Sequence, residues 1–208
     1  MQAPRPLQAC RSALLATAIA LASACGERAK LEPLAADAVV LAFGDSLTFG
    51  TGAAESESYP AQLEALIGRR VVRAGVPGEL SAQALARLPA ALEQHAPQLV
   101  LLCIGGNDFL RRAGNAQTEQ NVRAMVKLAR SRGVGVVLIG TPEPGLFLSP
   151  PAFYAEIAEE FHLPYEAGAI AEVLKDAALK SDPIHPNARG YRVIAERLAE
   201  RLKKSGAI

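Results

Sequence analysis

The sequence has few of the residues that usually build disulfide frameworks and metal centres. It contains three cysteines and three histidines among 208 residues. Apart from the neighbouring pair Asp182 and His185, no cluster of histidine and acidic residues has the spacing of a metal site. Cys103 lies inside an apolar run, which is typical of an inert packing cysteine. We therefore expect no metal ion and no other cofactor.

The sequence also lacks an excess of either charge. It has 22 lysines and arginines against 21 aspartates and glutamates, so the formal net charge is +1. Neither a nucleic acid nor an anionic surface is indicated as a partner by such a balance. Half of the residues are hydrophobic, and no repeat or low-complexity tract interrupts them. These features are typical of one globular domain of ordinary size.

The N-terminus differs from the rest of the chain. Residues 1–24 contain Arg5 and Arg11 but no acidic residue, and an apolar stretch covers residues 12–21. Small residues follow at positions 22–24, and the apolar stretch is too short to span a bilayer. A positive start, a short apolar core and small residues at a cleavage point predict a secretory signal peptide over residues 1–24. Its removal would change the net charge from +1 to −1.

Cys25 directly follows those small residues, so the segment resembles a bacterial lipoprotein signal. This resemblance implies acylation of Cys25 and a lipid anchor in the membrane. Neither Gly26 nor Glu27 is the aspartate of an inner-membrane retention signal, so an exported, periplasmic protein anchored at the outer membrane is expected. Simple secretion is the alternative. We expect residues 25–37 to form a short tether and residues 38–208 to form the folded domain.

Apolar runs and helical patterns alternate along that domain. Strands are predicted at residues 39–43, 70–74, 99–104 and 135–139. Helices are predicted at residues 58–67, 118–132 and 153–161, in a stretch from Leu85 to Leu92 that breaks or restarts at Pro89, and after Asn187. This alternation predicts an α/β fold, a three-layer α/β/α sandwich with a flavodoxin-like parallel sheet.

Turn residues follow the predicted strands at Ser46, Gly78, Asn107 and Thr141. Because parallel strands end at one edge of their sheet, these four turns should open on the same rim, where ligands bind in such folds. Ser46 could cap a helix there, or it could supply a nucleophilic hydroxyl and a backbone N–H donor.

A serine becomes a nucleophile when a base accepts its proton and a carboxylate orients that base. His95 and His162 lie in polar or boundary stretches and are expected at the surface. His185 lies in a proline-containing loop, three residues after Asp182. The sequence therefore favours Ser46, His185 and Asp182 as partners, although a helix-capping loop with an incidental acid would have the same pattern.

Four short motifs occur in a fixed order: GDSL from Gly44, a glycine at Gly78, GGND from Gly105, and DPIH from Asp182. In order and approximate spacing they resemble the SGNH, or GDSL, hydrolases, over residues 38–204. The sequence is most similar to the bacterial branch that includes arylesterases and periplasmic thioesterase/lysophospholipase enzymes. Two departures are Arg73, where asparagine is often found, and Glu79-Leu80, where Asp-Thr is commoner.

The resemblance implies a role for each residue in these motifs. Ser46 would be the nucleophile, His185 the general base and later acid, and Asp182 the carboxylate that orients the histidine. The N–H groups of Ser46 and Gly78 and the side-chain amide of Asn107 would form the oxyanion hole.

The expected function is therefore a serine esterase that hydrolyses acyl or aryl carboxylic esters, or lysophospholipids, through an acyl-enzyme. An apolar substrate pocket could be lined by residues beside the rim turns: Phe109, Leu110, Leu146 and Phe147. One alternative is an O-acetyl esterase of cell-wall or exported polysaccharide. Another is a non-catalytic lipoprotein that binds lipid or glycan.

Overall fold

The computed structural model describes residues 29–145 and 148–208. The predicted signal peptide, Cys25, Leu146 and Phe147 therefore lie outside the described residues. Within the described part, no helix is both long and apolar enough to cross a bilayer.

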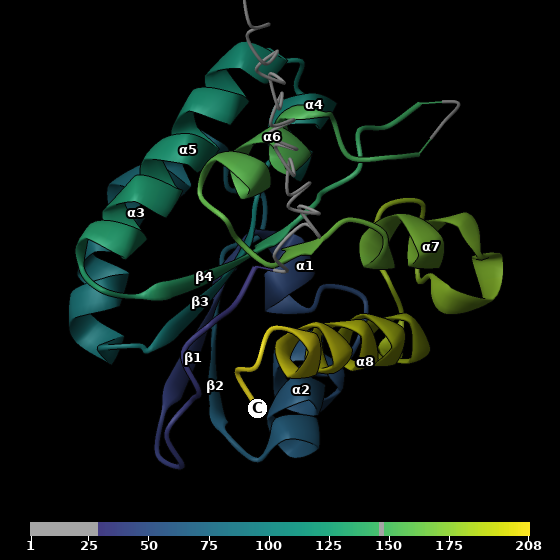
Figure 1. Ribbon diagram of the computed structural model, residues 1–208. Coiled ribbons are helices and arrows are strands. Elements are labelled where there is room, and N and C mark those ends of the chain that lie inside the picture. The colour runs from purple at the N-terminus through teal and green to yellow at the C-terminus, as the bar shows by residue number, and fades with distance from the viewer. Residues whose placement is uncertain (1–28, 146–147) are drawn as a thin grey trace, which may run out of the picture.

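A central sheet of five parallel strands organises the described chain (Figure 1). The spatial order is β2-β1-β3-β4-β5, the flavodoxin-like order. The strands are β1 (Val39–Gly44), β2 (Arg70–Gly75), β3 (Leu99–Cys103), β4 (Gly135–Ile139) and β5 (Tyr165–Glu166). The predicted α/β fold with a flavodoxin-like parallel sheet is confirmed.

Helices cover both faces of this sheet, as a parallel sheet requires. The described helices are α1 (Ser46–Phe49), α2 (Tyr59–Ile67), α3 (Ser81–His95), α4 (Gly106–Leu110), α5 (Asn115–Ser131), α6 (Phe153–Glu160), α7 (Ala169–Lys175) and α8 (Ala188–Lys204). Two short 3-10 turns lie at Glu55–Glu57 and Ala177–Leu179. Figure 1 shows α3 and α5 on one side of the sheet and α2 and α8 on the other.

Successive strand residues divide between two hydrophobic cores because their side chains alternate across the sheet. In β1, Val40 and Ala42 belong to the core under α2, α7 and α8. Leu41 and Phe43 belong to the core under α3, α5 and α6. The apolar run of β1 is therefore buried on both faces, which explains why it has no polar alternation.

Several elements differ from the sequence prediction, and among them the five-residue α4 was not predicted as a helix. The two-residue β5 and helix α7 were not predicted, because the first is too short for a pattern and the second is apolar on most sides. Helix α3 runs unbroken through Pro89, so the predicted break there is wrong. Ala84, Leu88, Ala91 and Leu92 are buried on both sides of the proline, and this burial offsets the roughly 3 kcal/mol that an interior proline costs.

The predicted tether is partly fixed to the domain. The N–H groups of Leu31 and Leu34 donate to the carbonyls of Ser205 and Ala207, at 2.9 and 2.8 Å. Leu34 is also buried in the core under α8. The folded unit therefore begins before residue 38, because the C-terminal turn offers both hydrogen-bond acceptors and an apolar surface.

The carboxyl ends of the strands lie at one edge of the sheet. From β1 the chain passes to β2 on one side of β1, and from β2 it crosses to β3 on the other side of β1. The gap between the turns after β1 and β3 is therefore a topological switch point. Ligands bind at such points in open α/β sheets. The first residues after β1 and β3 should therefore flank the site.

Candidate active site

Ser46 is the first residue of α1 and is separated from the end of β1 by Asp45 alone. The Asp45 side chain caps this short helix by accepting a hydrogen bond from the Leu47 N–H at 3.1 Å. The first N–H groups of a helix have no acceptor within the helix, so the Ser46 N–H is available to a ligand. Ser46 itself lines a cavity at this edge of the sheet.

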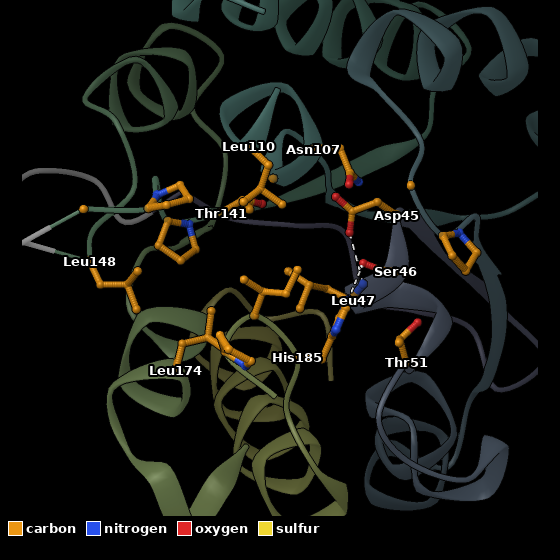
Figure 2. Close-up of a pocket in the computed structure, with 18 residues that line it drawn as sticks. Asp45, Ser46, Leu47, Thr51, Asn107, Leu110, Thr141, Leu148, Leu174 and His185 are labelled. Atoms are coloured by element: carbon orange, nitrogen blue, oxygen red, sulfur yellow. Dashed lines mark hydrogen bonds between the residues drawn. The ribbon is translucent and has the colours of Figure 1, made fainter. Parts of the chain in front are cut away.

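His185 lies beside Ser46 at one end of this cavity (Figure 2). Its Nε2 is 3.0 Å from the Ser46 Oγ, and its Nδ1 is 2.7 Å from Oδ2 of Asp182. In the tautomer that donates Nδ1–H to the carboxylate, Nε2 accepts the serine hydroxyl. This geometry can remove the hydroxyl proton and can hold the resulting imidazolium beside a carboxylate.

The loop that presents His185 is held by its own hydrogen bonds. Oδ1 of Asp182 accepts the N–H groups of Ile184 and His185, both at 2.9 Å. Partial burial raises the pKa of Asp182, but hydrogen bonds from the His185 ring and from these two N–H groups outweigh it. The pKa is therefore held below its ordinary value, and the carboxylate remains ionised at neutral pH.

Gly78 and Asn107 line the same cavity as Ser46. Gly78 has φ of +77°, a conformation that side chains rarely adopt, in the turn after β2. The Asn107 Nδ2 donates to the carbonyl oxygen of Glu79 at 3.1 Å. An amide has two N–H donors, so the second can be offered to a ligand. Thr141 lines the cavity too, so the four predicted turns do share one rim.

The cavity has a volume of about 490 Å³, within the range of small-molecule sites. Figure 2 shows Ser46 and His185 at one end and Leu148 and Leu174 at the other. Most of the side chains that line the cavity are apolar: Leu47, Leu110, Pro142, Pro144, Leu148, Leu174, Pro183 and Ile184. The arrangement therefore places the Ser46 hydroxyl at one end of a largely apolar chamber.

Of the predicted pocket residues, Leu110 lines the cavity and Phe109 does not. Phe109 is buried in the core, with its ring centroid 6.3 Å from that of Phe153 and 6.5 Å from that of Tyr154. Both residues lie in α4, and the helical rotation between neighbours turns one inward and the other toward the cavity. Cys103 is fully buried as predicted, and burial raises the pKa of its thiol.

Several cavity residues were missed by the sequence reasoning. Leu148 and Leu174 come from a loop and from α7, which had no recognisable motif. His95 and His162 lie outside the cavity lining, as expected. No group of three or more histidine, cysteine or acidic residues in the described chain could hold a metal ion.

Comparison with known proteins decides the family. The model of the GDSL-like lipase/acylhydrolase family matches residues 42–193. This chain belongs to that family. The match includes every motif residue that lines the cavity, from Ser46 to His185.

Individual relatives agree with this family. The chain is 35% identical to thioesterase 1/protease 1/lysophospholipase L1 of Escherichia coli K12, over 81% of this chain and 85% of that protein. It is 32% identical to esterase TesA of Pseudomonas aeruginosa, over 88% and 96% respectively. The fold matches esterase EstA from Pseudoalteromonas sp. with a TM-score of 0.73, at 24% identity, covering 81% of this chain and 98% of that one. The chain is therefore an ester hydrolase of the GDSL family.

Asp45, the residue before Ser46, has a buried carboxyl group with a raised pKa. Burial raises its pKa from 3.8 to about 7, against the hydrogen bond from Leu47, and the nearby charges of Glu79 and Asp108 add to the rise. In the unfolded chain Asp45 loses its proton near pH 4. Between about pH 4 and 7 the folded state therefore binds more protons, and raising the pH through this range lowers the free energy of unfolding.

We expect Asp45→Asn to remove this pH dependence. Denaturant unfolding of both proteins at pH 4 and pH 8 should show the variant gaining stability relative to wild type as the pH rises, by up to about 4 kcal/mol. The asparagine oxygen can still accept the Leu47 N–H, so the helix cap is kept. If the free energy of unfolding changes with pH equally in the two proteins, the titration is not that of Asp45.

Proposed function

We propose that this esterase hydrolyses carboxylic esters with an apolar acyl group, lysophospholipids included, through an acyl-enzyme formed on Ser46. His185 accepts the Ser46 proton and passes it to the leaving alcohol, and then activates the water that releases the acid. Asp182 orients the imidazole and stabilises its charged form. The observation that supports these roles most directly is the hydrogen-bonded series from Ser46 through His185 to Asp182, at 3.0 and 2.7 Å.

The oxyanion of the tetrahedral intermediates is stabilised by three fixed donors. These are the N–H groups of Ser46 and Gly78 and the side chain of Asn107. All three residues line the same cavity, which supports this assignment. Loss of one such donor typically costs about 2.7–4 kcal/mol of barrier height.

The apolar chamber supports an acyl chain over a polysaccharide as the bound group. Each methylene that leaves water contributes about 0.8 kcal/mol, so the apolar lining favours longer acyl groups than acetyl. A sugar ring would instead require polar partners. Among the described residues that line the cavity, Thr51 and Thr141 are the uncharged polar side chains outside the motif positions.

The protein is exported, with residues 1–24 as its signal peptide and Cys25 as the site of lipid attachment. The composition of residues 1–24 supports export, and the cysteine directly after three small residues supports acylation. A lipid anchor would hold the esterase at the membrane surface, where lysophospholipids are found.

The serine mechanism can be tested by measuring the hydrolysis rates of p-nitrophenyl esters from acetate to palmitate, with a chelator present. Wild type should hydrolyse them, and Ser46→Ala should lose roughly a thousandfold or more in kcat. The kcat/KM should rise by up to about fourfold per added methylene until the chamber is filled, and then level off. A maximum at acetate would favour the glycan O-acetyl esterase, and turnover by Ser46→Ala would refute the serine mechanism.

The chamber predicts that Leu148→Trp shortens the preferred acyl chain, because the larger ring occupies the end distant from Ser46. The kcat/KM for p-nitrophenyl acetate should change little, while that for the longer esters should fall by about tenfold. Leu66→Trp, on the exposed face of α2, is the matched control and should leave the profile unchanged. Equal losses on short and long esters in Leu148→Trp would contradict this placement of the acyl group.

The lipid anchor predicts that the full-length protein, expressed in a bacterial host with labelled palmitate, is labelled and sediments with membranes. Cys25→Ser should abolish the label, because the acyl chain requires the thiol. Recovery of unlabelled wild-type protein in the soluble periplasmic fraction would instead support simple secretion.

A further inference from the structure

A buried ion pair lies directly behind the proposed oxyanion donors. The Arg87 guanidinium, on α3, donates to both carboxylate oxygens of Glu79: Nε is 2.8 Å from Oε1, and Nη2 is 2.7 Å from Oε2. The Glu79 side chain is only 6% exposed and that of Arg87 is 29% exposed. Two parallel hydrogen bonds fix the carboxylate in direction as well as in distance.

The same guanidinium is held by the strands next to the site. The Nη2 nitrogen of Arg87 donates to the Ala74 carbonyl, near the end of β2, at 3.2 Å. It also donates to the Gly44 carbonyl, at the end of β1, at 3.4 Å. The guanidinium also lies over the Phe43 ring, 4.1 Å from its centroid. Arg87 thereby connects Glu79 to the strand that ends directly before Asp45 and Ser46.

The main chain of Glu79 connects the two proposed donors that are not part of α1. Its carbonyl oxygen accepts one N–H of Asn107, and the preceding residue is Gly78. The Glu79 N–H donates to the Val76 carbonyl at 3.2 Å, and the Val76 N–H donates to the Gly44 carbonyl at 3.0 Å. A displacement of Glu79 would therefore move both the Gly78 N–H and the Asn107 amide relative to Ser46.

We propose that Glu79 and Arg87 are positioning residues that set the geometry of the oxyanion hole. Neither side chain reaches the reacting atoms, and the proposal depends on the function assigned to Gly78 and Asn107 above. A buried ion pair is weak evidence for stability, since apolar residues of similar volume are often as stable. What this pair supplies is a fixed direction for the turn after β2, at the point where preorganised donors have most effect on the rate.

The proposal predicts a loss of kcat with little change in KM. In Glu79→Gln, an amide nitrogen replaces one carboxylate oxygen. This nitrogen cannot accept a hydrogen bond from Arg87, so the turn can shift. We expect kcat for p-nitrophenyl butyrate to fall by roughly 10- to 100-fold, with KM within about threefold. Glu79→Asp keeps the charge and should recover part of the loss. Burst kinetics should show acylation and deacylation slowed together, since both pass through an oxyanion.

A double-mutant cycle separates positioning from general stabilisation. Asn107→Ala removes one of the donors that Glu79 positions, so adding Glu79→Gln to it should cost less than Glu79→Gln costs alone. Independent effects that multiply would contradict the proposal. Glu160→Gln is the matched control, because it breaks the 2.8 Å ion pair with Arg123 between α5 and α6, away from the cavity. Its kcat should stay within twofold of wild type.

A normal kcat in folded Glu79→Gln would also overturn the positioning role, whether or not the melting temperature of the variant falls. If Glu79→Gln does not fold, Arg87→Lys provides the same test, since it keeps the charge but loses the paired hydrogen bonds. Ser46-dependent hydrolysis by wild type is measured first, so failure of the proposed function is distinguished from failure of this inference.

Discussion

The close approach of β1 and β3 is the constraint on which the site depends. A side chain at Gly44 would place its Cβ 1.8 Å from the Cys103 carbonyl oxygen, so only glycine allows the two strand ends to lie together. At Gly75 the corresponding atom would be 2.1 Å from the Phe49 backbone nitrogen. These contacts bring the turns after β1, β2 and β3 close enough for Ser46, Gly78 and Asn107 to line one cavity.

The histidine reaches this cavity from the far end of the chain, 139 residues after Ser46. Helix α8 is joined to the segment after α1 by the Tyr191 hydroxyl, which donates to the Thr51 carbonyl at 2.8 Å. Asn187 caps α8 through the N–H groups of Arg189 and Gly190, and its side-chain amide donates to the carbonyls of Ala178 and Lys180. The loop with Asp182 and His185 is therefore fixed at both ends before any substrate binds.

Three acidic side chains are buried at or next to the site in which the proposed mechanism develops a negative charge. Each is compensated differently. Glu79 pairs with Arg87, Asp108 accepts hydrogen bonds from the N–H and the hydroxyl of Ser81, and Asp45 has a pKa raised to about 7. Uncompensated carboxylates at these positions would oppose an oxyanion, because electrostatic interactions are strong in a buried, poorly solvated region. These three arrangements would reduce the repulsion between the buried carboxyl groups and the proposed oxyanion.

The sequence by itself determined the layered α/β fold, the rim of turns and the motif residues, because strand-length apolar runs and short motifs are local signals. Tertiary structure decided what depends on contacts between distant segments. The sheet order brought Leu148 and Leu174 to the chamber, helical rotation in α4 turned Phe109 into the core, and burial on both sides carried α3 through Pro89. The Glu79–Arg87 pair likewise has no sequence signature, because its direction depends on backbone carbonyls from two other strands.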